Sequence, residues 1–170
     1  MKKSATKKLV IAALFTTLTM LSTLFIRLPL PIGYVHLGDA FVLLSAFLLG
    51  PIWGSLAAGM GSALADVFGY VTYAPATLII KALMALLASL SFNALKKPLK
   101  YPVFAQIIAG VLGTLVMAAG YFVYESLLFA TVGVAFINLL WSLLQGAVGA
   151  VIAILTMHVL TKTSIENYLK

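Results

Sequence analysis

Long apolar runs, separated by short polar or proline-rich stretches, fill the chain from one end to the other. A helix needs about 20 predominantly apolar residues to cross the hydrocarbon core of a bilayer. Residues 29–39 interrupt the pattern with two prolines and two glycines, which predicts a loop or re-entrant turn. The runs predict membrane helices over residues 9–28, 38–50, 52–69, 73–95, 102–129 and 133–161.

Residues 40–68 allow two interpretations: one kinked helix, or two helices joined by a tight turn at Gly50 and Pro51. Cytoplasmic loops are enriched in lysine and arginine, so the lysines decide between them. With two helices and an internal N-terminus, the three lysines of residues 96–100 return to the cytoplasm, as do those of the C-terminal tail. We therefore predict an all-α integral membrane protein with six transmembrane helices and cytoplasmic N- and C-termini. Its short second helix must tilt or lie where the bilayer thins.

The amino-acid composition agrees with an integral membrane protein. The 170 residues are 63% hydrophobic and 9% charged, against about 45–50% and about 25% in soluble domains. The net charge of +7 comes from lysines that flank the apolar runs, which indicates membrane topology rather than nucleic-acid binding. Without cysteine, disulfides and thiolate metal sites are excluded. We expect a single membrane domain over residues 1–170, because no internal repeat is visible.

Two charged residues inside the predicted helices need an explanation, because a charge in lipid is expensive. Lys81 lies about eight residues into the fourth predicted helix, and Glu125 lies about one turn from the outer end of the fifth. The two therefore reach comparable depths. They either pair with each other and hold two helices together, or line a polar pocket that opens to the outside.

Polar rows on three helices favour the pocket. Asn138, Trp141, Ser142 and Gln145 follow the spacing i, i+3, i+4 and i+7 and share one helix face. Such amides often only join helices, but three rows converging at one depth favour a site for a small polar ligand. Tyrosines at the outer rim, such as Tyr70, are either interfacial anchors or lids over the ligand. The predicted substrate-binding residues are His36, Tyr73, Thr77, Lys81, Tyr121, Glu125, Asn138, Trp141 and Gln145.

Other chemistry finds less support in the sequence. Asp39 is expected to cap the N-terminus of its helix, where a carboxylate stabilises exposed N–H groups. His36 has no second histidine nearby, so we expect no metal site and no cofactor. Motifs of proteases, hydrolases and P-loop ATPases are absent, so we expect no enzymatic activity and no autonomous use of ATP.

Small residues on the first predicted helix form a possible docking surface. Ala12 and Thr16, and Ala13 and Thr17, are two overlapping pairs four residues apart. Such pairs let helices approach closely, either within this chain or toward another membrane protein.

Four segments resemble the substrate-binding (S) component of energy-coupling factor (ECF) vitamin transporters. They are HLGDAFVLL at 36–44, LGPIWG at 49–54, GSALAD at 61–66 and APATLIIK at 74–81. The resemblance covers essentially the whole chain and extends to its length and six-helix order. Residues 37–66 carry its most specific part.

This resemblance implies a membrane subunit in a bacterial plasma membrane that binds a vitamin or precursor from outside. In such proteins helices four to six and the loops after helices one, three and five hold the ligand. A transmembrane coupling protein and two cytoplasmic ATPases are the implied partners, docked through an Ala-xxx-Ala pair that reads Ala12-xxx-Thr16 or Ala13-xxx-Thr17 here. The polar and aromatic residues favour a hydroxymethylpyrimidine or pyridoxine type of ligand. The alternatives are a stand-alone ion-coupled transporter that uses Lys81 and Glu125 as a relay, and a structural membrane subunit.

Overall fold

The protein is described by a computed structural model that covers residues 2–29, 34–129 and 132–163. Five of its helices are long and apolar enough to cross a membrane, as judged within those ranges. The three C-terminal helices begin and end within one residue of the predicted bounds. The elements are α1 (Lys2–Phe25), β1 (Arg27–Pro29), β2 (Tyr34–His36), α2 (Gly38–Gly69), α3 (Ala74–Leu95), α4 (Pro102–Leu128) and α5 (Val132–Thr161).

A two-stranded hairpin replaces the last turn of the first predicted helix. The prediction of a helix up to residue 28 was wrong, because α1 ends at Phe25 and β1 pairs with β2 in an antiparallel register. Arg27 lies opposite His36, and Leu28 lies opposite Val35. A residue that precedes proline is disfavoured in the helical region, so Pro29 turns Leu28 toward extended backbone. The expected loop over residues 29–39 therefore begins as a strand.

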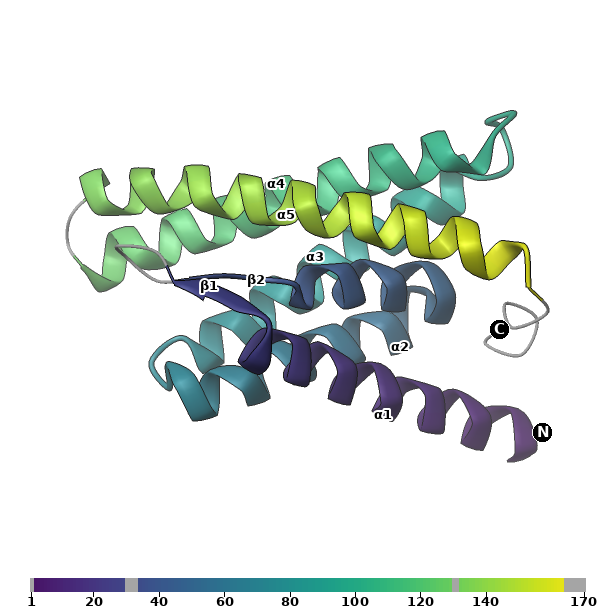
Figure 1. Ribbon diagram of the computed structural model, residues 1–170, viewed down its shortest axis with the longest axis horizontal. Helices are drawn as coiled ribbons and strands as arrows, with labels where there is room; N and C mark the ends of the chain where they lie inside the picture. The colour runs from purple at the N-terminus through teal and green to yellow at the C-terminus, as the bar shows by residue number, and fades with distance from the viewer. Residues whose placement is uncertain (1, 30–33, 130–131, 164–170) are drawn as a thin grey trace.

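Helix α2 reverses direction at Gly50. The φ angle of Gly50 is +79°, in the left-handed region that favours glycine, and Pro51 follows as the first residue of the next helical stretch. The hydroxyl of Ser45 donates to the carbonyl oxygen of Gly54 at 3.1 Å, whereas nine residues of straight helix would separate them by roughly 13 Å. The two arms, residues 38–49 and 51–69, therefore lie side by side (Figure 1).

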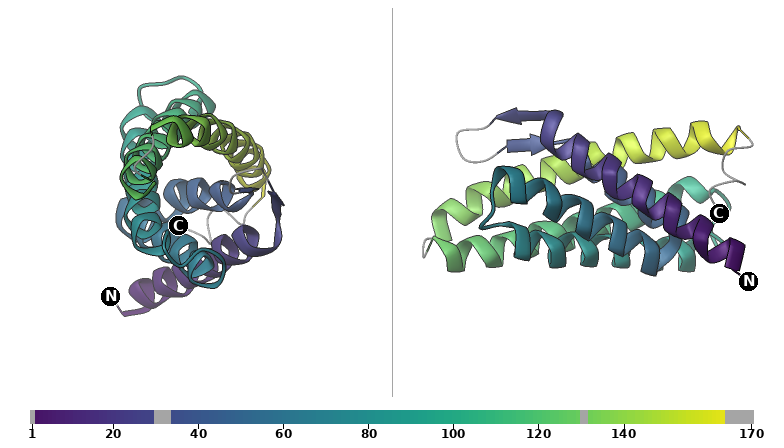
Figure 2. Two further views of the ribbon diagram at one scale, coloured as in Figure 1. Left: turned by 90° about the vertical axis from the view of Figure 1, so that its left-hand side faces the viewer. Right: turned by 90° about the horizontal axis from the view of Figure 1, so that it is seen from below.

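The first arm of α2 runs through the middle of the molecule. Of residues 38–48, all except the half-buried Phe41 are buried, and α2 contacts each of the other four helices. Seen along the long axis, the remaining helices form a ring around this arm (Figure 2). An apolar helix of only about 12 residues is typical of a buried core rather than of a lipid-facing span. Its short length is therefore accommodated by protein rather than by a tilt against lipid.

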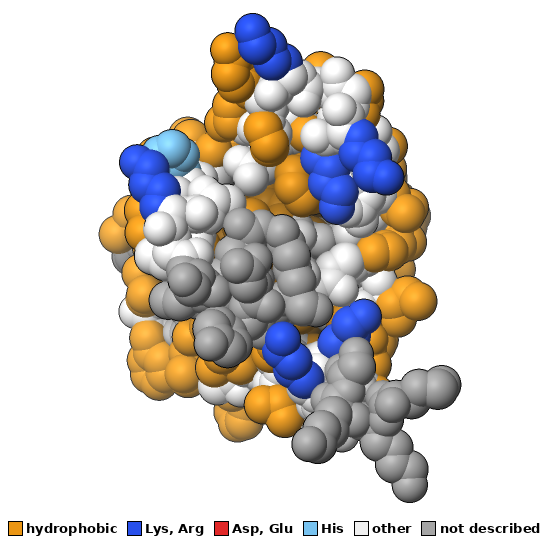
Figure 3. Space-filling view, turned by 90° about the vertical axis from the view of Figure 1, so that its right-hand side faces the viewer, with side chains coloured by type: hydrophobic (Ala, Val, Ile, Leu, Met, Phe, Trp, Pro, Cys, Tyr) orange, Lys and Arg blue, Asp and Glu red, His pale blue; other side chains and the backbone are white. Residues whose placement is uncertain are grey.

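The start of α1 and the end of α5 lie at one end of the bundle, and the described lysines gather there (Figures 1 and 3). Lys7, Lys8, Lys162 and the three lysines of residues 96–100 are all exposed. The described carboxylates, Asp39, Asp66 and Glu125, are all buried. Exposed leucines, valines and isoleucines on all five helices cover the flanks, as lipid contact requires. The molecule therefore has one basic end and an apolar belt.

The contact between the arms of α2 gives a test of this packing. A Cβ added to Gly54 would lie 2.6 Å from the carbonyl oxygen of Ser45 and 2.9 Å from the Cα of Ala46. Because these are backbone atoms, the arms must separate, and we expect Gly54→Ala to lower the free energy of unfolding by about 1–3 kcal/mol. Gly133→Ala is the matched control, since no described atom lies within 4 Å of its added Cβ. Thermal unfolding in detergent measures both, and equal melting temperatures would contradict the prediction.

Candidate functional site

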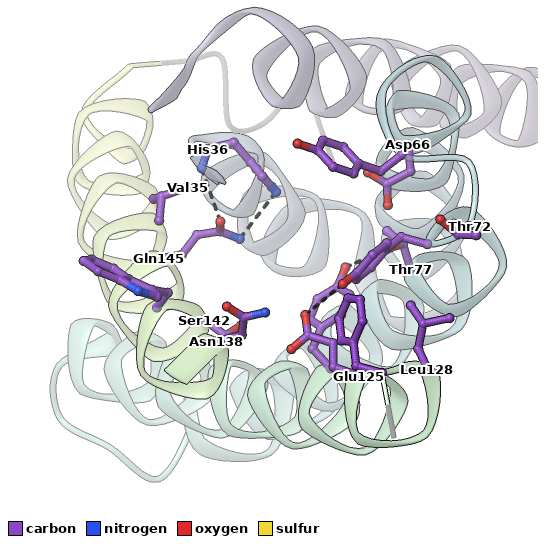
Figure 4. Close-up of a pocket in the computed structure, with 15 residues that line it drawn as sticks. Val35, His36, Asp66, Thr72, Thr77, Glu125, Leu128, Asn138, Ser142 and Gln145 are labelled. Carbon is purple, nitrogen blue, oxygen red and sulfur yellow. Dashed lines mark hydrogen bonds between the residues drawn. The ribbon is translucent and has the colours of Figure 1, made fainter. Parts of the chain in front are cut away.

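A cavity of about 380 Å³ opens at the end of the bundle opposite the start of α1 and the end of α5. Its walls come from β2, the outer ends of α2 to α5 and the connection between α2 and α3 (Figure 4). The volume falls in the lower part of the range of small-molecule pockets, about 300–1,000 Å³. The lining residues are Val35, His36, Asp66, Tyr70, Thr72, Tyr73, Thr77, Tyr121, Glu125, Leu128, Phe129, Asn138, Trp141, Ser142 and Gln145.

One wall of the pocket is built from tyrosines and a carboxylate. The hydroxyl of Tyr73 donates to Oε1 of Glu125 at 3.4 Å, and Thr77 shares a hydrogen bond of 3.0 Å with the hydroxyl of Tyr121. The ring centroids of Tyr73 and Tyr121 are 6.5 Å apart, within the range of aromatic pairs. Burial and the nearby carboxylate of Glu125 raise the pKa of Tyr73, so its hydroxyl stays protonated and available as a donor. This wall offers flat apolar faces with hydroxyl groups at their edges.

The opposite wall is the polar face of α5. Asn138, Trp141, Ser142 and Gln145 all line the cavity, as their helical spacing predicts. The indole of Trp141 remains partly exposed, with a relative accessibility of 36%. A ligand in the cavity would therefore lie between this indole and the tyrosines across from it.

A buried polar network closes the base of the pocket. Oε1 of Gln145 accepts from the backbone N–H of His36 at 3.2 Å, and Nε2 of Gln145 donates to Oδ2 of Asp39 at 2.8 Å. Oδ1 of Asp39 forms an ion pair with Lys81, whose ammonium also contacts the sulfur of Met117 at 2.7 Å. These contacts join β2, α2, α3, α4 and α5 directly below the cavity.

Two expectations about these charges were wrong. Lys81 does not line the cavity and does not pair with Glu125; its side chain is 1% exposed and is held by Asp39. Asp39 is not a helix cap, since the N-terminus of α2 has no side-chain capping bond and the carboxylate points instead to Lys81. The relay expected for an ion-coupled transporter thus lacks its direct pair. The central arm of α2 brings a closer carboxylate to Lys81 than α4 does.

His36 lies at the boundary between the network and the cavity. Burial lowers the pKa of His36 to about 4, against the opposing effect of the Asp39 charge, so the imidazole is neutral near pH 7. Its Nδ1 accepts the backbone N–H of Gly38 at 3.1 Å, and its Nε2 lies 3.4 Å from the side-chain nitrogen of Gln145. Within residues 2–29, 34–129 and 132–163, no three His, Asp or Glu side chains lie close enough to hold a metal ion.

The remaining predicted site residues come together as a group. Apart from Lys81, every one lines the cavity: His36, Tyr73, Thr77, Tyr121, Glu125, Asn138, Trp141 and Gln145. The lining residues that the sequence did not predict lie mostly at helix ends and in connections. There, helical periodicity does not predict which way a side chain faces. These residues are Val35, Asp66, Tyr70, Thr72, Leu128, Phe129 and Ser142, of which Tyr70 and Ser142 carried a signal as a rim tyrosine and as a member of the α5 polar row.

A family model described as "ECF-type riboflavin transporter, S component" matches residues 3–162. The chain belongs to this family. S components are the substrate-binding membrane subunits of ECF transporters, which in general comprise a coupling protein and ATPases and carry vitamins. The resemblance seen in the sequence is therefore confirmed for the family, while the hydroxymethylpyrimidine or pyridoxine branch stays a prediction.

Two further comparisons agree with this S component assignment. A solved structure titled "Structure and mechanism of the S component of a bacterial ECF transporter" superposes with a TM-score of 0.68. It covers 93% of this chain and 97% of that one at 22% identity, which shows a common fold. A Pyrococcus woesei protein described as "Uncharacterized protein in gap 3'region" is 38% identical over 103 residues. That alignment spans 59% of this chain and 66% of the relative, slightly under two thirds of its length.

The small residues on α1 of this S component divide between the interior and the surface. Ala12 is buried and Thr16 is half-buried, and a Cβ added to Gly61 of α2 would lie 2.5 Å from the carbonyl oxygen of Thr16. The Ala12 row therefore packs within the chain. Ala13 and Thr17 are exposed and remain on the outer surface of α1.

The ion pair below the pocket gives a double-mutant test. Breaking a buried pair strands a charge, so Asp39→Asn and Lys81→Met should each lower the free energy of unfolding by about 3–5 kcal/mol. The double variant removes both charges and should recover most of that loss. Thermal unfolding in detergent measures the cycle, with Lys96→Met as the exposed-lysine control. Additive losses in the double variant would show that the pair is not coupled.

Proposed function

We propose that this S component captures a small, planar, hydroxyl-bearing nitrogen heterocycle from outside a bacterial cell and delivers it inward. A transmembrane coupling protein and two cytoplasmic ATPases complete the importer, and ATP hydrolysis takes place in those ATPases. The chain itself carries out no covalent chemistry. The observation that carries the proposal is the cavity of about 380 Å³, which combines aromatic faces with hydroxyl, amide and carboxylate groups.

The position of the cavity supports capture from outside. It opens at the end of the bundle opposite the start of α1 and the end of α5, whereas the exposed lysines lie on the face shown in Figure 3. Since positive loops favour the cytoplasmic side, the basic end is proposed to face the cytoplasm and the cavity to face outward. The reversal at Gly50 supports the proposal that α2 contributes two passes rather than one. Six passes would place both termini inside, which is the topology expected from the sequence.

Aromatic faces and polar edges define the class of ligand. The family description names riboflavin, whereas the sequence favours a hydroxymethylpyrimidine or pyridoxine type. All three are flat nitrogen heterocycles that carry hydroxyl groups. Tyr121 and Trp141 offer stacking surfaces, while Thr77 and Tyr73 offer hydroxyl partners.

Binding of these vitamins tests the proposal directly. Purified protein should quench or shift its tryptophan fluorescence on titration with at least one of riboflavin, hydroxymethylpyrimidine and pyridoxine, because Trp141 lines the cavity. Trp53 is the only other tryptophan, so a Trp53→Phe background isolates the signal. Mass spectrometry of protein purified without added ligand identifies any molecule that is retained. Absence of binding across the panel, together with no retained heterocycle, would contradict the proposed function.

Docking is proposed to use the exposed pair on α1. Ala13→Leu places a larger side chain where a partner helix would approach, and should sharply reduce co-purification of the coupling protein and ATPases. Ligand binding should be unchanged, since α1 does not line the cavity. Val151→Leu is the control, an enlarged side chain at an exposed position of α5. Intact assembly with Ala13→Leu would move the docking surface elsewhere.

A further inference from the structure

Two buried acceptor atoms beside the cavity have no hydrogen-bond partner. They are Oε2 of Glu125 and Oδ1 of Asn138, on residues that are 6% and 9% exposed. Five buried side-chain atoms lack a partner among the described residues, and only these two belong to residues that line the cavity. Figure 4 shows both side chains directed from α4 and α5 into the site.

Unpaired buried acceptors need an explanation, because the great majority of buried polar groups are hydrogen-bonded. The other oxygen of Glu125, Oε1, accepts a long hydrogen bond of 3.4 Å from the hydroxyl of Tyr73. Lys81, for which a pair with Glu125 was one of two expected roles, instead contacts Asp39 and Met117. Glu125 therefore receives no positive charge from the part of the protein that the structure describes.

The orientation of Asn138 follows from its neighbour. Its side chain hydrogen-bonds to Glu125, and Figure 4 shows the amide nitrogen on the side that faces this carboxylate. The amide must therefore turn its NH₂ group toward Glu125, which leaves Oδ1 as the free end. The two residues together present an acceptor pair.

The charges of the residues that line the cavity also favour a ligand that donates hydrogen bonds. Asp66 and Glu125 both line the cavity, and no lysine or arginine does so among the described lining residues. His36, the one histidine there, is neutral near pH 7. A ligand that enters this site therefore meets the carboxylate of Glu125, which has no ion pair with any described residue.

We infer that the acceptor pair of Glu125 and Asn138 selects a heteroaromatic base with two adjacent N–H donors, a protonatable ring nitrogen beside an exocyclic amine. This inference rests on the proposed function and narrows its ligand class. Such an edge supplies both hydrogen bonds and, when protonated, the charge that complements Glu125. A flavin edge has one N–H between two carbonyl oxygens, and those oxygens would face acceptors here. The chemistry of the site thus favours an aminopyrimidine over a flavin, although the family description names riboflavin.

A matched pair of ligands tests the inference on the unaltered protein. The probes are hydroxymethylpyrimidine with its exocyclic amine and the analogue in which a carbonyl oxygen replaces that amine. The amine should bind at least about ten-fold more tightly, because the analogue loses a charge-assisted hydrogen bond and places an acceptor against acceptors. Calorimetry measures both dissociation constants, and riboflavin is titrated alongside. Equal or tighter binding of the carbonyl analogue, or of riboflavin, would overturn the inference.

A substitution then assigns the preference to its residue. Glu125→Gln keeps the shape of the side chain but adds an NH₂ donor, so the preference for the amine should shrink or reverse toward the carbonyl analogue. Val123→Ala, on the lipid-exposed face of α4, is the control and should leave the ratio unchanged. An unchanged ratio in Glu125→Gln would also overturn the inference.

Different results would contradict the proposed function and the acceptor-pair inference. If riboflavin or pyridoxine binds and the amine shows no advantage, the importer function stands and the acceptor-pair inference is overturned. If no heterocycle binds at all, the proposed function fails and the inference fails with it.

Discussion

A lysine ammonium enclosed within the bundle is the constraint on which the pocket depends. Lys81 is 1% exposed and Asp39 is fully buried, so neither charge is solvated by water. An isolated charge in such a place is strongly unfavourable, and the pair is stable only while the two helices hold the carboxylate against the ammonium. The register of α3 against the central arm of α2 is therefore fixed at this depth. Gln145, which lines the cavity, hydrogen-bonds directly to Asp39 of this pair.

The same carboxylate extends the constraint to the rest of the site. Asp39 also accepts from Gln145, which fixes α5, and Gln145 in turn accepts the backbone N–H of His36. The hairpin of β1 and β2 is thus connected to α5 through this glutamine. Without the reversal at Gly50, α2 could not place Asp39 inside the ring of helices. The central arm of α2 is short for a membrane span, and it places the carboxylate of Asp39 beside Lys81.

Helical periodicity predicted residues in the walls of the site but not the buried polar network at its base. Asn138 and Gln145 could be assigned to one face because a helix repeats every 3.6 residues, whatever surrounds it. The partner of Lys81 could not, because Asp39 and Glu125 reach similar depths and only the placement of α2 at the centre decides between them. That placement depends on packing between residues far apart in the chain. Asp66 was missed for a related reason, since its role as a lining residue depends on which neighbours surround the end of α2.

The polar residues of the outer half divide into those that hold the site and those that recognise a ligand. Lys81 and Asp39 pair with each other, so neither needs a ligand as its partner. If their substitution weakened ligand binding, the cause would be the loss of the polar network at the base of the pocket. Glu125 and Asn138 differ because each retains a buried acceptor that the described protein does not satisfy. A folded chain tolerates such atoms where another molecule completes them. Unmet hydrogen bonding, more than charge alone, therefore distinguishes the residues that we propose recognise a ligand in this S component.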